Sequence, residues 1–334
     1  MPLRFGVRIP RTGPFASGSA IVSVARETEQ LGYDSVTSND SVSFAYKHRY
    51  HFSAGTVEGV DEIERSTNGY EAVTSLSYIA GITRRVRLIT ICLVLPLRNP
   101  MMLAKQYATI QELSGNRFVL GLCVGNMEDD FENFGVPFEK RGEIMDEYLE
   151  ALKRILSSSP VSAFEGKYLK FSGEFYPKPA VAPIWIAGGF VGSSLRRVAK
   201  YGAGWIPICT PAQLESGLAK VKEMRKELGR EGASLECGPQ VFVGAGTSYE
   251  DAWNRAGNTV TKFGQLPEMA RQTKADFAQM NLIGSSSDVS KRIEEYCQAG
   301  ANYMELKFVA RDSADMLRQM GLLSKEILPS FSSR

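Results

Sequence analysis

Eight short apolar runs, rich in valine, isoleucine and leucine, alternate with helical patterns along the chain. Such near-continuous apolar runs are typical of parallel strands that helices cover on both faces. Strands alternating with helices predict a parallel α/β fold, and eight such units are the number that closes a (β/α)8 TIM barrel. The predicted strands cover about residues 3–9, 33–38, 86–95, 117–124, 183–187, 204–208, 239–245 and 302–309.

The length of 334 residues allows either two domains or one large barrel with insertions. An open doubly wound sheet is the alternative arrangement of the same units. We predict a single TIM-barrel domain over residues 1–334, because eight units in one chain close naturally. Three insertion loops interrupt it, at about residues 41–69, 158–182 and 263–284. The second reads as a polar hairpin, whereas the first and third leave the carboxyl ends of strands and are the lid candidates.

The segment 87–100, RLITICLVLPLRNP, joins two different kinds of chain. Its apolar first half suits the third barrel strand. Its second half, from Pro96 to Pro100, is polar and rigid, and it predicts a turn into a helix that starts near Asn99. The segment therefore predicts a strand that leaves the barrel at the face where active sites lie.

Composition excludes several classes of function. The 39 basic and 37 acidic side chains leave a net charge of +2, which gives no electrostatic footprint for nucleic acid. No window approaches 18 consecutive apolar residues, so we expect no transmembrane helix. The start of the chain lacks a secretory pattern and the five cysteines lack metal spacing, which together predict a cytoplasmic protein. Cys92 and Cys123 lie inside apolar runs and are expected to be buried.

A glycine-rich turn follows the fifth predicted strand, in the sequence PIWIAGGFVGSSLRRV of residues 183–198. The strand runs into Gly188 and Gly189, and a helix begins nearby with Ser193 and Ser194 in its first turn. Glycine lets the backbone approach a ligand closely, and a helix amino terminus presents unpaired N–H groups to an anion. The pattern fits a phosphate site and an ordinary tight turn equally well.

Gly125 and Asn126 follow the fourth predicted strand, where backbone and amide groups are well placed to hydrogen-bond a ligand. The acidic residues that come next, from Glu128 to Asp130, favour the first turn of a helix, because the helix dipole stabilises negative charge there. A metal site at this point has no histidine nearby to support it, and we predict none.

Asp40 lies just beyond the second predicted strand and is the candidate acid or base. A carboxylate in a partly closed pocket can acquire a raised pKa and transfer protons. The alternative is a loop aspartate that accepts hydrogen bonds from backbone N–H groups. His48 and His51, the only histidines, have no third metal ligand in sight, which favours a surface position.

Three stretches of the chain resemble the luciferase-like monooxygenase superfamily, in the same order. They are LRFGVRIP with ARETEQLGYDSVTSND, then RRVRLITICLVLPLRNP continuing through LSGNRFVLGLCVGN to EALKRI, and finally GEFYPKPAVAPIWIAGGFVGSSLRRVAKYGAGWIPI. The resemblance covers most of the chain, but not residues 41–69 and 263–284. It implies a (β/α)8 barrel that binds FMN or the deazaflavin coenzyme F420 at the carboxyl-end face, and it implies a homodimer.

The resemblance also implies roles for individual residues. Those that would receive the coenzyme phosphate are Ala187, Gly188, Gly189, Ser193 and Ser194. Those that would line the ring or the ribityl chain are Gly125, Asn126 and Glu128. Ile91 and Cys92 match the place where family members carry a non-prolyl cis peptide, in a bulge behind the coenzyme ring.

One departure from the family concerns proton transfer. Many relatives have Asp-His where this chain reads Asp40-Ser41, so the usual histidine is missing. Asp40 is the first substitute, and His48, His51 or a tyrosine of the 41–69 loop are the others. The aromatic residues of that loop predict a partly apolar small-molecule substrate, with contacts from Phe44, Tyr46 and Tyr50.

These observations predict an F420-dependent oxidoreductase that transfers hydride between the coenzyme and an activated C=C, C=N or C=O bond. The alternative is an FMN-dependent monooxygenase that uses O2 and receives reduced flavin from a partner reductase. A non-catalytic flavin-binding scaffold is a further alternative, because of the missing histidine.

Overall fold

The computed structural model describes residues 2–13, 15–40, 49–52, 55–58, 68–159, 161–254 and 274–332. Within them, eight parallel strands form the central sheet, and each predicted apolar run contains one of them. Neighbours in the sheet follow the order of the chain, and the last strand pairs with the first. These strands are β1 (Arg4–Arg8), β2 (Ser35–Ser38), β5 (Arg87–Thr90), β7 (Phe118–Cys123), β10 (Ile184–Ala187), β11 (Gly204–Ile206), β13 (Gln240–Ala245) and β15 (Tyr303–Phe308).

The barrel closes between β11 and β13 through a short strand, β12 (Glu236–Cys237), which pairs in parallel with β11. The chain then runs directly into β13, and the N–H groups of Gly238 and Gln240 donate to the carbonyl oxygens of Trp205 and Pro207 at 3.2 and 2.9 Å. The prediction of a (β/α)8 barrel is confirmed. The open doubly wound alternative is wrong, because β15 pairs with β1 on one side and β13 on the other.

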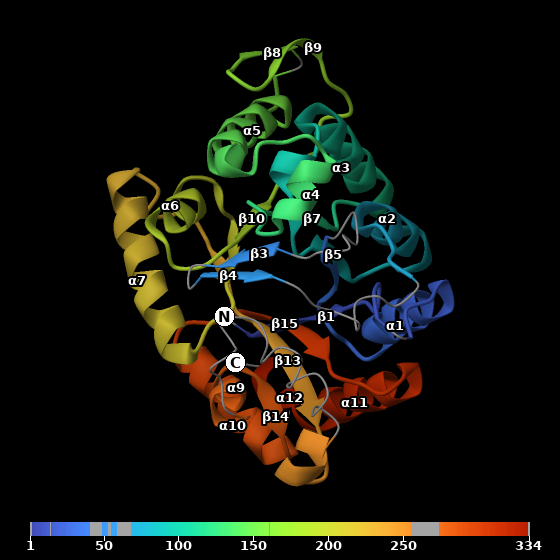
Figure 1. Cartoon of the computed structure of the whole chain (residues 1–334). Helices are drawn as coiled ribbons and strands as arrows, with labels where there is room; N and C mark the ends of the chain where they lie inside the picture. Colours follow the sequence, from blue (N-terminus) through green and yellow to red (C-terminus); the bar gives the residue numbers. More distant parts are fainter. Residues whose placement is uncertain are drawn as a thin grey trace.

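Helices surround the sheet on its outer side (Figure 1). Side chains cap several of them, as the local sequence requires. Asn99 accepts hydrogen bonds from Met101 and Met102 at the start of α3, and Ser285 forms a capping box with Asp288 at the start of α10. The outer helices are α1 (Gly18–Gln30), α2 (Ala72–Ile82), α3 (Pro100–Ser114), α5 (Arg141–Ile155), α6 (Gly192–Tyr201), α7 (Pro211–Glu227), α10 (Ser286–Gln298) and α11 (Ser313–Glu326).

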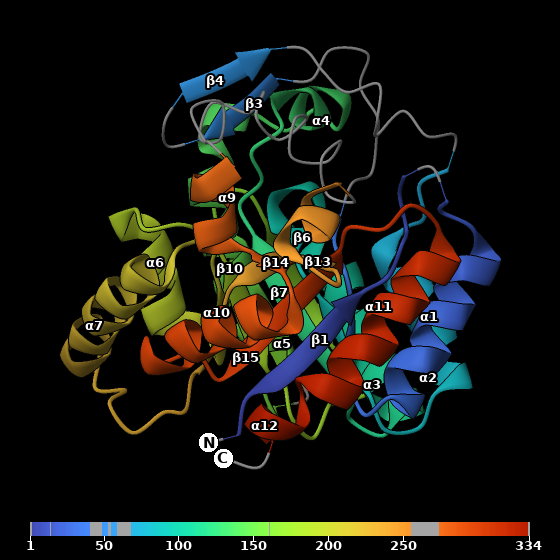
Figure 2. The ribbon, with the colours of Figure 1, turned by 90° about the horizontal axis from the view of Figure 1, so that it is seen from below.

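Shorter elements decorate the two ends of the barrel. Figure 2 shows the chain termini at one end and the antiparallel pair β3–β4 with α4 at the other. The hairpin predicted within 158–182 is confirmed as the antiparallel pair β8–β9. The short elements are β3 (Arg49–Phe52), β4 (Gly55–Glu58), β6 (Leu93–Val94), η1 (Leu95–Leu97), α4 (Glu128–Asn133), η2 (Phe138–Lys140), β8 (Val161–Glu165), β9 (Lys170–Glu174), α9 (Lys274–Met280), β14 (Leu282–Gly284) and α12 (Pro329–Ser332).

An apolar cluster fills the middle of the barrel, separate from the larger core between sheet and helices. Trp185 and Tyr303 are its largest members, and their rings meet edge to face with centroids 4.8 Å apart. Glycines on neighbouring strands make room for them, because a Cβ at Gly204 would overlap the Trp185 ring and one at Gly6 would overlap the Tyr303 hydroxyl. The other members are Ile89, Ile91, Val119 and Ile206.

Arg87 closes the barrel below this cluster, at the amino ends of the strands. Its guanidinium pairs with Asp34 at 2.7 Å and with Glu236 at 2.8 Å. The same guanidinium lies 5.4 Å from the centre of the Trp185 ring and 5.8 Å from that of Tyr303. One arginine therefore joins three strands and covers the apolar interior.

We expect Arg87→Met to lower the free energy of unfolding by about 1–2 kcal/mol, because it removes the closer cation from two partly buried carboxylates, Asp34 and Glu236, and leaves them only the more exposed Arg4. Urea unfolding followed by circular dichroism measures the change. Arg26→Met, on the exposed face of α1, is the control and is expected to change the same quantity by less than about 0.5 kcal/mol. Equal effects of the two substitutions would contradict the role given to Arg87.

Candidate functional site

The carboxyl ends of the barrel strands bring together several of the predicted site residues. Ile91 and Cys92 follow β5, and the peptide bond between them is cis, as the family resemblance implies. The Ile91 N–H donates to the Ser38 carbonyl at 2.7 Å, which ties this point to the end of β2. Ile91 is buried in the barrel interior, whereas Cys92 is partly exposed.

Cys92 and Cys123 lie next to each other at the ends of β5 and β7. Both are free cysteines, and both residues keep some exposed surface, so the expectation that they are buried is wrong. The reason is their place at the end of the barrel, where the interior opens. Contact with the Cys123 thiol and withdrawal from water raise the pKa of the Cys92 thiol well above its usual value, while the charge of Arg8 acts in the opposite direction. The thiol of Cys92 is therefore protonated at neutral pH.

Asp40 is held by a salt bridge at the rim. Arg98 donates to its carboxylate through Nε at 3.1 Å and Nη2 at 2.8 Å, and the Val94 N–H donates to the same carboxylate at 3.1 Å. The Asp40 side chain is 1% exposed. Arg98 Nη2 also reaches Glu71, the residue that caps α2, at 3.0 Å. The network joins the end of β2, the exit from β5 and the start of α2.

This pairing favours a positioning role for Asp40 over proton transfer. A carboxylate that accepts three hydrogen bonds has its oxygens occupied and its orientation fixed. Its acid–base role stays a prediction. The alternative that the sequence left open, an aspartate that accepts from a backbone N–H, matches the bond from Val94.

The residues after β7 form a tight turn into α4. Gly125 has a φ of +80°, and a Cβ there would meet Val94 and Phe131 at 2.6 and 2.8 Å, so only glycine fits. Asn126 is exposed, and Glu128 is the first residue of α4. The prediction that the acidic residues form a helix first turn is confirmed.

The turn after β10 leads into α6 and leaves the start of that helix open. Val191 occupies the cap position and provides no side-chain hydrogen bond to the helix. A Cβ at Gly188 would overlap the Ser194 hydroxyl, whereas one at Gly189 would have no atom within 4 Å. Ala187 and Gly188 are partly buried, and Ser193 and Gly189 are exposed beside them. Gly189 and Ser193 therefore face open space at the start of α6, with the buried Ser194 hydroxyl behind Gly188, and this arrangement fits an anion.

The predicted substrate contacts and histidines fall largely outside the described residues. Phe44, Tyr46, Ser41 and His48 are not among them. Tyr50 and His51 belong to β3, whose side chains are not described. Among the residues that are described, no cluster of three or more histidine, cysteine, aspartate or glutamate side chains could hold a metal, and no helix is long and apolar enough to cross a membrane.

A charged group in the upper barrel interior was not predicted. Arg8, the last residue of β1, donates to Glu305 through Nε at 2.8 Å and Nη2 at 2.5 Å, and Nη2 also donates to Gln240 at 2.7 Å. The Thr37 hydroxyl donates to Glu305 at 2.6 Å. The signal in the sequence was a charged residue within each of two apolar strands, Arg8 in FGVRIP and Glu305 in YMELKF.

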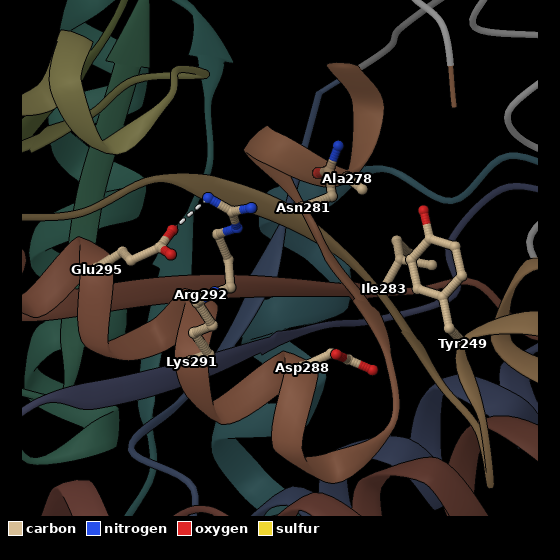
Figure 3. Close-up of a pocket in the computed structure, with 8 residues that line it drawn as sticks. All are labelled: Tyr249, Ala278, Asn281, Ile283, Asp288, Lys291, Arg292 and Glu295. Carbon is tan, nitrogen blue, oxygen red and sulfur yellow. Dashed lines mark hydrogen bonds and ion pairs between the residues drawn. The ribbon is translucent and has the colours of Figure 1, made fainter. Parts of the chain in front are cut away.

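A separate cavity of about 160 Å³ lies between α9, β14 and α10 (Figure 3). None of the predicted site residues line it. Asp288 is occupied in capping α10, and Arg292 pairs with Glu295. The lining residues are Tyr249, Ala278, Asn281, Ile283, Asp288, Lys291, Arg292 and Glu295.

Comparison with known proteins agrees with this geometry. A family model described as luciferase-like monooxygenase matches residues 4–303. An uncharacterised protein of Mycobacterium tuberculosis is 31% identical over 218 residues, which cover 63% of this chain and 72% of that protein. The FMNH2-dependent dimethylsulfone monooxygenase of Pseudomonas putida is 25% identical over 329 residues, which cover 87% of this chain and 86% of that enzyme.

Solved structures show the same fold. An F420-dependent secondary alcohol dehydrogenase, in complex with an F420–acetone adduct, superposes with a TM-score of 0.78 at 18% identity over 98% of each chain. At this identity the likeness shows a shared barrel.

We expect the Asp40–Arg98 pair to show a coupling free energy of about 2 kcal/mol in a double-mutant cycle of Asp40→Asn and Arg98→Met, because one partner is fully buried and the bond is bidentate. Urea unfolding of the four proteins measures it. The Lys140–Glu143 pair, at 3.1 Å with exposures of 44% and 52%, is the control and should couple by less than about 0.5 kcal/mol. Similar coupling in the two pairs would contradict a structural role for Asp40.

Proposed function

The chain belongs to the luciferase-like monooxygenase family, and from this premise we propose that it is an oxidoreductase that uses coenzyme F420. Its substrate is a partly apolar small molecule with an activated C=C, C=N or C=O bond. The observation that carries the proposal is the open amino terminus of α6 directly after β10, at the same barrel end as the β5 bulge.

The start of α6 fits a phosphate group. The first turn of a helix has N–H groups without intrahelical partners, and its dipole favours negative charge. Val191 supplies no capping side chain, and the Ser194 hydroxyl lies against Gly188 at the edge of the open space. Gly188, Gly189, Ser193 and Ser194 would therefore hold the phosphate, with Ala187 at the end of the strand.

The mouth of the barrel fits a flat ring. Ile91 and Cys92 would lie behind the ring, and the turn at Gly125 and Asn126, with Glu128 next to it, would contact its edge or the ribityl chain. At Gly125 the side chains of Val94 and Phe131 occupy the place of a Cβ, so this residue would offer only its backbone to the coenzyme. The bound coenzyme would supply the hydride, and the protein would orient the ring and keep water from it.

Asp40 and Arg98 would position this part of the mouth. Their salt bridge fixes the chain that leaves β5 immediately after Cys92, since Val94 donates to the same carboxylate. Asp40 would then affect the reaction indirectly, by fixing the segment that supports the ring.

We expect Asp40→Asn to lower activity without a shift in the pH profile of the reaction, because the residue only positions the ring. A displaced acid limb of that profile would instead support proton transfer by Asp40.

The segments LVLPLRNP and LSGNRFVLGLCVGN resemble deazaflavin-dependent members of the family more than the luciferases, and this resemblance supports F420 as the coenzyme. The alternative is an FMN-dependent monooxygenase that receives reduced flavin from a partner reductase. The match to an FMNH2-dependent monooxygenase, over 87% of this chain, supports this alternative. A non-catalytic flavin-binding scaffold on the same barrel is the third possibility.

Anaerobic titration with F420 and FMN, each in oxidised and reduced form, separates these functions. We expect tighter binding of F420 than of FMN, followed by absorbance and fluorescence changes of the coenzyme. Binding of FMN alone would replace the proposal with the monooxygenase. Binding of neither would contradict both.

We expect Gly189→Asp to weaken coenzyme binding by at least about tenfold, because a carboxylate at the start of α6 repels the phosphate. This position is preferable to Gly188, where a new side chain would first displace Ser194. Gly232→Asp is the matched control, since a Cβ at Gly232 also meets no atom within 4 Å and the residue lies in the loop after α7. Unchanged affinity in Gly189→Asp would remove the phosphate assignment.

A further inference from the structure

We propose that Arg8 is a ring-positioning residue whose free guanidinium nitrogen, Nη1, binds the negatively charged edge of the reduced coenzyme and thereby favours the reduced form over the oxidised form. The inference rests on the coenzyme site proposed above. It adds a contact from β1, on the side of the barrel away from the phosphate, and gives that contact a measurable effect on the coenzyme.

Arg8 is fixed from below. Its Nε and Nη2 form a bidentate pair with Glu305, and Nη2 also donates to Gln240. Glu305 is fully buried and is itself held by the Thr37 hydroxyl. A planar guanidinium held at two of its nitrogens has its third nitrogen oriented in advance. The direction of Nη1 is therefore set by β13 and β15.

Nη1 is available to a ligand. Across the described part of the chain, no acceptor is bonded to this nitrogen, and 12% of the Arg8 side chain remains exposed. Arg8 is the last residue of β1, so the exposed part faces the carboxyl-end mouth. A cation placed in this way, with donors left unused, is suited to an anionic group that enters the barrel mouth.

Arg8 lies next to the residue that would support the ring. Its charge acts on the Cys92 thiol, which shows that the two side chains are electrostatic neighbours. Arg8 and Cys92 both lie at the carboxyl-end side of the barrel, Arg8 at the end of β1 and Cys92 after β5. A ring placed against Cys92 would therefore be closer to Arg8 than a substrate on the other face of the ring.

The order of the strands supports this geometry. In the eight-membered ring of strands, β1 and β10 are four positions apart, and β5 lies midway between them. A coenzyme that begins at α6 after β10 and crosses the bulge after β5 therefore points its far edge at β1. Reduced flavins and deazaflavins carry their negative charge at the pyrimidine edge of the ring, and nearby protein charge tunes it.

The test compares the dissociation constants of the oxidised and reduced coenzyme, F420 and FMN each, under anaerobic conditions with dithionite as reductant. In Arg8→Gln/Glu305→Gln we expect the ratio of the oxidised to the reduced constant to fall by at least about tenfold relative to the wild type. Arg8→Lys, which keeps the charge, should recover part of the ratio. Should the glutamine pair fail to fold, Arg8→Met/Glu305→Met replaces it, because apolar residues often substitute for buried ion pairs.

The matched control is Arg4→Gln/Glu236→Gln. Arg4 pairs with Glu236 at 3.2 Å at the other end of the same strand, about 13 Å away by strand geometry. The control removes the same two charges and is expected to lower stability while leaving the ratio unchanged. A merely structural role of Arg8 predicts the same result for both double variants.

The outcomes separate this inference from the function on which it rests. A lower ratio of the oxidised to the reduced dissociation constant in the Arg8 variants, with no change in the Arg4 control, supports the inference. Wild-type binding of either coenzyme with an unchanged ratio in the Arg8 variants overturns the role of Arg8 and leaves the coenzyme site in place. No binding of F420 or FMN by the wild type overturns both.

Discussion

The interior of this barrel is closed by arginine–carboxylate pairs at two levels, and a packed apolar layer lies between them. Arg87 covers the amino ends of the strands by pairing with Asp34 and Glu236. Above it lies the apolar layer of Trp185 and Tyr303. The Arg8–Glu305 pair lies above that layer. Apolar side chains therefore separate the two charged levels, and the upper pair is the one at the carboxyl ends of the strands.

The exit from β5 shows how a local sequence serves two purposes. Its apolar half places Ile91 in the barrel interior, and its polar half returns Arg98 to the carboxylate of Asp40. The Val94 N–H bonds the same carboxylate, so the chain on the far side of Cys92 is held at two points. In the function proposed above, such fixed flanks would hold the bulge against a flat ring, which accounts for rigid polar residues so close to an apolar strand.

Local sequence pattern predicts the helices and strands of this protein, whereas contacts between residues far apart in the sequence determine the geometry of the site. The strands and the cap at Asn99 were predictable because each depends on neighbouring residues. The cis bond at Ile91–Cys92 was predictable only through the family resemblance. Arg8 and Glu305 are 297 residues apart in the sequence, and no spacing rule connects them before the barrel closes. Asp40 was identified as important, but its partner Arg98 lies 58 residues away and changes what its carboxylate can do.

A buried ion pair is a weak way to stabilise a core, because desolvation offsets most of the attraction and apolar residues of similar size often do as well. The Arg87 pairs lie at the barrel end and cover it. The Arg8–Glu305 pair replaces apolar filling directly beneath the mouth, where it adds little stability. In the function proposed above, this pair would present a guanidinium N–H donor on the side of the mouth opposite the open start of α6, which suits a coenzyme that carries a phosphate at one end and a reduced ring at the other.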